Sequence, residues 1–344
     1  MKTNVSKQAT PRRRLVRRLL IAATVACVSL GVVGIGVVAA VGVGIRQALE
    51  KSGYIEVWTD ADGFFVDGVP YGPNDWNKID LYFPKEIAPE RSRGAVLFIH
   101  GGAWNAGNRQ DMAGFARRTA KGGYVAASLG YMLAGDKTKD VYSMNAVMDE
   151  IDAALKTLKE EATKRGAPLE KVALSGDSAG GHIATLYAYS RGKNAPLPVV
   201  FVAPRVGPSD FHLETWPNLD PETVAGIVSI MTRKLTSVED LKAKTPETEA
   251  AIASISPAAF AENGGAIPTL AAFGGEDNLV PTPHRERLVA ALEKSGVKFD
   301  VVDFPNSGHM LASDPEATER RRELFFEYAD RYLNVVPETE NAAE

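Results

Sequence analysis

The stretch KVALSGDSAGGH, residues 171–182, decides the fold class of this chain. Its first six residues form a short apolar run, as buried parallel strands do, and a helical pattern over 179–190 follows. Gly176, Ser178 and Gly180 therefore stand as Gly-x-Ser-x-Gly at a strand-to-helix turn. Such a turn needs small neighbours if the serine hydroxyl is to project above the sheet edge. The pattern makes Ser178 the candidate nucleophile.

Short β-rich runs and helical patterns alternate on both sides of this turn. The predicted strands cover residues 95–100, 124–131, 171–176, 198–204, 268–275 and 299–305, with edge strands at 54–58 and 78–83. The helical patterns cover residues 144–163, 179–190, 284–295 and 316–333. Because strands that alternate with helices form βαβ units, the order predicts an α/β fold with one doubly wound, mostly parallel sheet.

Residues 53–334 are predicted to form one domain, because no repeat or long linker divides them. The interval 205–266 departs from the alternation, since it separates two predicted strands and holds helical stretches of its own. An insertion at strand ends commonly forms a cap over a site, and a plain surface excursion is the alternative. The polar tail, residues 335–344, is predicted to be disordered.

A basic segment and a long uncharged run precede this domain. Residues 1–18 hold seven basic side chains and no acid, and residues 19–45 are 27 residues without a charge. A run of this length spans a bilayer, and the basic residues before it favour the cytoplasmic side. We expect a basic cytoplasmic segment, a transmembrane signal anchor over 19–45 and a domain exported to the cell envelope or the extracellular side. Secretion after signal cleavage is the alternative.

Composition narrows the function classes of the exported domain. Beyond residue 18 the chain has 32 basic and 43 acidic side chains, so nucleic acid, which is bound through Lys and Arg, is not an expected partner. Cys27 is the only cysteine, which excludes a disulfide and a thiolate metal site. We expect no cofactor and no metal ion, and the sequence leaves the oligomeric state open.

A serine hydroxyl needs a base to take its proton, so the histidines are the next candidates. Four of the five lie at a strand end, on helices or in the cap interval: His100, His182, His212 and His284. His309 remains, in FPNSGHML on the loop after the last predicted strand. We predict that His309 is the base.

The base needs a carboxylate that fixes its tautomer. FGGEDNLVP, residues 273–281, follows a predicted strand and presents Glu276 and Asp277 on its exit loop. Asp277 is the preferred acid; Glu276, Asp210 and Asp303 are the alternatives. The chain order Ser178, Asp277, His309 is the order of the α/β-hydrolase fold.

The stretch IHGGAWNAG, residues 99–107, ends another predicted strand with a pair of glycines. Glycine lets backbone N–H groups approach a ligand closely, so the pair could serve a phosphate, a transient oxyanion or merely a tight turn. The loop lacks the lysine of a P-loop and opens no GxGxxG helix, which argues against a phosphate. A serine nucleophile needs donors at this strand end, so we interpret the loop as an oxyanion loop.

Taken together, these motifs resemble the carboxylesterases related to hormone-sensitive lipase. The resemblance rests on HGGAW, GDSAGGH, the pattern Gly275, Asp277, Val280, Pro281, and GH at 308–309, and it runs from about residue 79 to 333. It is closest to the HGGxW branch of feruloyl-type, small-ester and arylformamidase-like enzymes. The resemblance implies an α/β-hydrolase fold and an oxyanion hole built from the backbone N–H groups of Gly101, Gly102 and Ala179.

The same resemblance implies supporting roles for other residues of these motifs. His100 and Trp104 would shape the loop, and His182 would be structural. Ala103 stands where the commoner pattern has a third glycine.

The function implied is a serine carboxylesterase that hydrolyses a small-molecule ester through a Ser-His-Asp triad and an acyl-enzyme. An arylformamidase-like or peptidase amide hydrolase is the first alternative. A non-catalytic binding module on the hydrolase scaffold is the second, and the presence of all three triad members argues against it. The sequence does not define the natural ester or its acyl-chain length.

Overall fold

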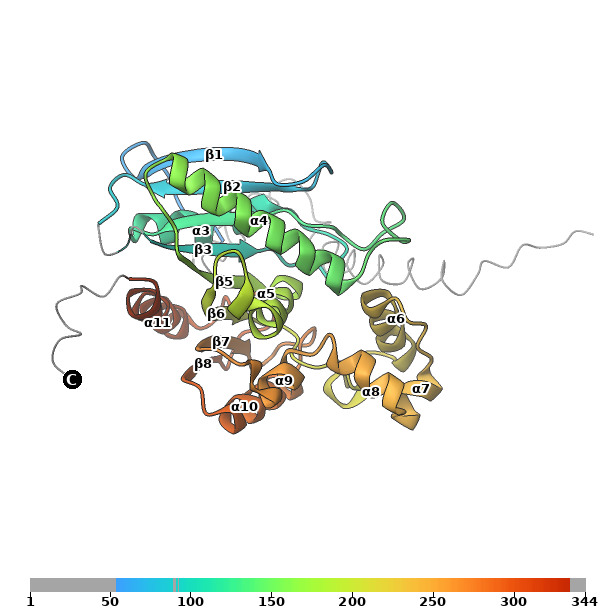
Figure 1. Ribbon diagram of the computed structural model, residues 1–344. Helices are drawn as coiled ribbons and strands as arrows, with labels where there is room; N and C mark the ends of the chain where they lie inside the picture. Colours follow the sequence, from blue (N-terminus) through green and yellow to red (C-terminus); the bar gives the residue numbers. More distant parts are fainter. Residues whose placement is uncertain (1–53, 89–90, 92, 335–344) are drawn as a thin grey trace, which may run out of the picture.

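The computed structural model describes residues 54–88, 91 and 93–334 (Figure 1). The expected cytoplasmic segment, signal anchor and disordered tail all lie outside these residues. Among the residues described, no helix combines the length and the apolar character that crossing a membrane requires.

A single mixed sheet runs through the described part of the chain (Figure 1). Its strands are β1 (Gly63–Pro70), β2 (Lys78–Pro84), β3 (Gly94–Ile99), β4 (Val125–Leu129), β5 (Lys171–Asp177), β6 (Val199–Arg205), β7 (Thr269–Gly274) and β8 (Phe299–Phe304). Their order is β1-β2-β4-β3-β5-β6-β7-β8. The β1/β2 and β2/β4 pairs are antiparallel and every other pair is parallel, so the predicted mostly parallel sheet is confirmed.

Helices cover both faces of this sheet. The α-helices of the described residues are α3 (Ala113–Lys121), α4 (Met144–Lys164), α5 (Ala179–Ser190), α6 (Pro221–Thr232), α7 (Val238–Ala243), α8 (Pro246–Ala253), α9 (Pro257–Phe260), α10 (Thr282–Ser295) and α11 (Pro315–Leu333). Side chains of α4, α5 and α10 share one apolar cluster with the sheet, whereas those of α3 and α11 belong to a second cluster. The sheet is therefore buried on both sides, as a doubly wound fold requires.

Strand β3 shows why its sequence is continuously apolar. Leu97 and Ile99 join the cluster of α4 and α5, while Val96 and Phe98 join the cluster of α3 and α11. All four side chains are buried. Successive side chains of a strand point to opposite faces, so both periods of this strand must be apolar.

The first predicted strand, 54–58, is wrong. These residues are irregular, and the edge strand is β1 at Gly63–Pro70. The aromatic side chains of the irregular segment pack inward instead of pairing along an edge: the Tyr54 ring lies 5.1 Å from Phe115 of α3, and Trp58 lies 6.1 Å from Tyr82. Helix α3 is also absent from the predicted elements, because its mean composition is polar and its apolar face is short.

The interval between β6 and β7 contains α6, α7, α8 and α9, of which α6, α7 and α8 stand apart from the sheet (Figure 1). Strong local signals start these helices. The Asp220 side chain accepts a hydrogen bond from Thr223 N at 2.9 Å with Pro221 at the first turn, and Ser237 and Asp240 form a capping box.

Candidate active site

Ser178 stands alone between the last residue of β5 and the first residue of α5. Its backbone has φ 53° and ψ −121°, an unusual conformation for a non-glycine residue. The Ser178 N–H donates to the carbonyl of Arg205 at 2.9 Å, which ties the turn to the end of β6. The predicted strand-to-helix turn at Ser178 is therefore present, and such strain is typical of functional positions.

The glycines of the motif are required by space. A Cβ on Gly180 would lie 2.0 Å from the carbonyl oxygen of Ile99, and a Cβ on Gly176 would lie 2.5 Å from the carbonyl of Gly180. Both distances are far below any real contact. Only residues without a side chain allow α5 to begin directly against β3.

The loop after β3 brings its glycine pair next to this serine. A Cβ on Gly101 would lie 3.2 Å from the Cβ of Ser178 and 2.9 Å from the carbonyl oxygen of Asp177. Gly102 has φ 116°, and Ala103 and Trp104 have φ 48° and 61°. Within the described residues, the N–H groups of Gly101 and Gly102 donate to no other protein atom.

Ala179 supplies the third predicted donor. It is the first residue of α5, and the N–H groups of a helix's first turn have no intrahelical partner. A helix N-terminus also favours negative charge beside it. The three residues predicted to form the oxyanion hole thus lie on two adjoining turns. Gly101 and Gly102 are on the loop after β3, and Ala179 is at the start of α5.

His100 supports the loop from behind. Its side chain is buried, its ring stacks on Tyr131 with 4.4 Å between centroids, and its Nδ1 lies 2.7 Å from the carbonyl oxygen of Gly101. The Tyr131 hydroxyl donates to the His100 carbonyl at 2.9 Å. Burial lowers the pKa of His100, so the ring remains neutral. The sequence alone does not identify Tyr131 as a residue that packs against His100 and donates to its carbonyl.

Asp277 and His309 meet at the carboxyl edge of the sheet. Asp277 follows β7, His309 follows β8, and His309 Nδ1 lies 2.7 Å from Asp277 Oδ2. The other oxygen, Oδ1, accepts from the backbone N–H groups of Leu279 and Val280 at 2.8 and 3.0 Å. The Asp277 side chain is fully buried and that of His309 is 19% exposed. The backbone therefore holds one oxygen of the Asp277 carboxylate in place, and the other oxygen binds the imidazole.

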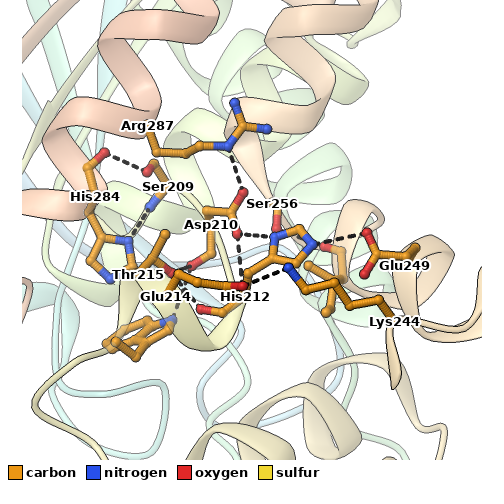
Figure 2. A network of polar contacts seen from close by, with 12 residues as sticks. Ser209, Asp210, His212, Glu214, Thr215, Lys244, Glu249, Ser256, His284 and Arg287 are labelled. Atoms are coloured by element: carbon orange, nitrogen blue, oxygen red, sulfur yellow. Dashed lines mark hydrogen bonds and ion pairs between the residues drawn. The ribbon is translucent and has the colours of Figure 1, made fainter. Parts of the chain in front are cut away.

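The three alternative acids lie elsewhere. Asp210 binds His212 and Arg287 (Figure 2), Asp303 pairs with Arg285 at 2.6 Å, and Glu276 is exposed. Asp210 and Glu276 follow strands of the same sheet and Asp303 lies within β8, so their places in the sequence are similar to that of Asp277.

The structure does not join Ser178 to His309 by a hydrogen bond within the residues it describes. The two residues share the carboxyl edge of the sheet, since β5 and β8 run parallel within one set of strands. Catalytic hydrogen bonds are often long without substrate and tighten when it binds.

The remaining histidines are occupied by other contacts. Burial lowers the pKa of His182 to about 4 and that of His284 to about 3. The His284 carbonyl accepts from the Ser209 hydroxyl at 2.6 Å (Figure 2). His212 is different, because a hydrogen bond to Asp210 raises its pKa to about 9, which makes it a cation near neutral pH.

A cleft of about 310 Å³ lies where the cap interval meets the start of α4. Its lining comes from the first residues of α4, the end of α6 and the segment before α9: Ser143, Met144, Asn145, Met231, Thr232, Arg233, Lys234, Ser254 and Ile255. Methionine and isoleucine side chains form its apolar part, and hydroxyl, amide and cationic groups form the rest. No group of three or more metal-ligating side chains occurs among the residues described.

Residues 79–292 match the BD-FAE family. The match covers more than half of the chain and includes the loop 99–107, the turn at Ser178 and Asp277. The chain belongs to the BD-FAE family. The resemblance to carboxylesterases related to hormone-sensitive lipase, predicted from the motifs, is thereby confirmed. His309 lies beyond the matched residues, so its assignment rests on the hydrogen bond to Asp277.

Two relatives of this BD-FAE chain come from Mycobacterium tuberculosis and are named as esterases. Esterase LipQ is 24% identical over 279 residues, which are 78% of this chain and 62% of LipQ. Esterase LipI is 30% identical over 137 residues, which are 40% of each chain. The matched region thus spans about three fifths of LipQ and two fifths of LipI.

Solved structures share the architecture of this BD-FAE chain. Esterase B of Lactobacillus rhamnosis has a TM-score of 0.65 at 16% identity, covering 93% of this chain and 96% of that one. A truncated carbohydrate esterase from gut microbiota has a TM-score of 0.64 at 20% identity, covering 79% and 98%. At such identities these likenesses establish the α/β-hydrolase fold, as predicted, and nothing more.

Proposed function

We propose that this chain is a serine carboxylesterase that hydrolyses small-molecule esters with Ser178 as nucleophile, His309 as base and Asp277 as the acid that orients it. The observation that carries the proposal is the 2.7 Å hydrogen bond between His309 Nδ1 and the buried carboxylate of Asp277. A structural Asp–His pair needs no strained serine nearby, whereas Ser178 is held at φ 53° on the same sheet edge. Family membership and the esterase names of the relatives support the same reaction class.

In this proposal His309 Nε2 takes the Ser178 proton as the hydroxyl oxygen attacks the ester carbonyl. Asp277 accepts a hydrogen bond from Nδ1–H, so it holds His309 in the tautomer whose Nε2 is free to take a proton. The same carboxylate stabilises the imidazolium that then forms. The carbonyl oxygen becomes an oxyanion held by the N–H groups of Gly101, Gly102 and Ala179. The alcohol leaves with the proton from His309, and water then releases the acid from the acyl-enzyme.

The oxyanion donors matter because they are fixed before the reaction. Losing one such donor typically lowers kcat by about 10²- to 10³-fold. Gly101 and Gly102 supply backbone groups, so no side-chain substitution removes them cleanly. A Cβ at Gly101 would instead meet the Asp177 carbonyl at 2.9 Å and move the loop.

The test is Ser178→Ala in the full chain, assayed with a short-chain aryl ester. We expect kcat to fall by at least about 10³-fold, because the nucleophile is lost while binding remains. Ser175→Ala is the matched control, since Ser175 is a buried serine of the same strand whose hydroxyl donates to the Ala203 carbonyl at 2.8 Å. The control should lose some stability and keep its kcat. Undiminished turnover by Ser178→Ala would refute the proposal.

A substrate panel separates ester from amide hydrolysis. It contains aryl esters of increasing acyl length, acetylated sugars, feruloyl esters, N-formyl aryl amines and peptide anilides. We expect the highest kcat/KM among the esters. A formyl amide or anilide as the best substrate would favour the arylformamidase-like or peptidase alternative, with the same residues acting on an amide carbonyl.

A further inference from the structure

His182 links three segments that are far apart in the sequence. It lies in the first turn of α5, fully buried. The Trp104 indole N–H donates to its Nδ1 at 3.1 Å, and its Nε2 lies 2.7 Å from the carbonyl oxygen of Ile255. A carbonyl only accepts, so Nε2 carries the proton and Nδ1 is the acceptor. One imidazole therefore connects the oxyanion loop, the nucleophile helix and the cap interval.

The ring keeps this tautomer throughout the working pH range. Burial lowers the pKa of His182 to about 4, so Nδ1 remains unprotonated and able to accept from Trp104. Phe211 packs against both rings, with centroids 5.0 Å from His182 and 6.0 Å from Trp104. The contact is thus buried and has one arrangement of donors and acceptors.

Trp104 needs an anchor because the loop around it is strained. Ala103 and Trp104 follow the glycine pair directly, and both have positive φ without being glycine. Backbone of this kind persists only where its surroundings hold it. One anchor is the Trp104 carbonyl, which accepts from Ala134 N at 2.8 Å. The other is the indole N–H, which donates to His182.

We propose that His182 is a positioning residue for ester hydrolysis: by holding the Trp104 indole it sets the N–H groups of Gly101 and Gly102 at the distance from Ser178 that the oxyanion requires. This inference rests on the proposed function. His182 contacts neither the substrate carbonyl nor the nucleophile's proton, and acts only through the loop.

The contact with Ile255 extends this role to the cap interval. Ile255 lines the cleft of about 310 Å³, and its carbonyl is the second partner of His182. The His182 imidazole thus joins a residue that lines this cleft to the loop that holds Trp104.

The first test is Trp104→Phe, which keeps an aromatic ring and removes the indole N–H. We expect kcat for an aryl ester to fall about 10- to 100-fold, less than for a deleted oxyanion donor, with KM nearly unchanged, since only transition-state binding is lost. A boronic acid inhibitor, which imitates the tetrahedral species, should weaken by the same factor. Trp216→Phe is the matched control, because the Trp216 indole N–H donates to a backbone carbonyl, that of Asp210, at 3.1 Å. It should keep the parent kcat.

The second test divides the two contacts of His182. His182→Asn places an amide oxygen near the Nδ1 position and retains the acceptor for Trp104, whereas His182→Gln extends its amide to the Nε2 position and retains the donor for Ile255. We expect the Asn variant to keep most of kcat and the Gln variant to match Trp104→Phe. The Trp104→Phe, His182→Gln double variant should be no slower than either single variant.

Melting temperature separates positioning from packing. If kcat in all variants simply follows the loss of melting temperature, or if Trp104→Phe equals Trp216→Phe in kcat and inhibitor affinity, the positioning role is overturned. Both outcomes presuppose that Ser178→Ala is inactive. An active Ser178→Ala variant would instead refute the proposed function itself.

Discussion

Two Asp–His pairs lie at the carboxyl ends of neighbouring strands, and they differ in one contact. Asp277 and His309 are 2.7 Å apart, and Asp210 and His212 are 2.6 Å apart. Both carboxylates are buried, with side-chain exposures of 0% and 1%. By the Asp–His distance alone, either pair would qualify as the acid and base of a triad.

The second imidazole nitrogen distinguishes the two pairs. His212 Nε2 lies 3.1 Å from Glu249 of α8, and Arg287 binds the far oxygen of Asp210 (Figure 2). His309 Nε2 makes no hydrogen bond with the residues described. A base needs a free nitrogen, so His309 is able to accept a proton. His212 is instead a cation held between the carboxylates of Asp210 and Glu249. The free Nε2 of His309, more than its contact with Asp277, is therefore what suits this histidine to the proposed role of base.

The largest expected effect is that of Asp277→Asn. The amide cannot accept from His309 Nδ1–H while its NH₂ faces the ring, so the wrong tautomer is favoured and kcat should fall about 10⁴-fold. Asp210→Asn is the matched change in the other pair, and it should leave kcat within the same order of magnitude while lowering the unfolding midpoint. Steady-state kinetics with an aryl ester, alongside urea unfolding, measures both. Similar losses of kcat in the two variants would erase the distinction between the pairs.

A smaller effect is expected from His212→Gln, in stability and its pH dependence. The hydrogen bond to Asp210 raises the pKa of His212 to about 9 from an ordinary value of 6.5. Its stabilisation is therefore fully present below about pH 6.5 and is lost as pH rises through about 9. Since the side chain is partly exposed, solvent screening limits the contribution to about 1 to 2 kcal/mol.

Urea unfolding at pH 6 and pH 9.5 measures this contribution. The parent chain should lose more stability between the two values than the Gln variant, which has no titrating group at position 212. Burial of Asp210 alone would raise its pKa, but the hydrogen bonds from His212 lower it, so this carboxylate stays ionised over the whole range. Equal losses in both chains would show that His212 is not the cation described.

The sequence predicts the Asp277–His309 pair, which we propose to be catalytic, and misses the Asp210–His212 pair with its partners for a physical reason. Ser178 and the glycines beside it carry local signals, because a sharp turn demands small residues at fixed spacing. Asp277 and His309 follow strands whose apolar runs are visible. Asp210 meets Arg287, 77 positions away, and nothing local in the sequence marks that contact.

The same reasoning explains the other differences. The strand predicted at 54–58 has the aromatic composition of a strand, but its rings are used in packing against α3 and β2. His182 is structural, as the family resemblance implied. Its partner Ile255, however, is 73 residues away on a segment whose placement depends on the whole cap interval. Motifs formed by neighbouring residues can be predicted from the sequence, whereas contacts between segments far apart in the sequence cannot.

The smallest effect is expected from Lys244→Met, which removes another ion pair of the network in Figure 2. Lys244 Nζ lies 2.6 Å from Glu214 Oε1, but the two side chains are 50% and 63% exposed. Exposed pairs gain little because water and salt screen them and ordering two long side chains costs entropy. Lys242→Met is the matched control, because Lys242 lies in the last turn of α7, just before the C-cap residue Lys244, and forms no ion pair with any described residue. Both variants should unfold at the urea concentration of the parent chain, in low and in high salt. A loss confined to Lys244→Met at low salt would contradict this expectation and would show that this exposed ion pair stabilises the cap interval, as the half-buried contact of His212 with Glu249 is expected to do.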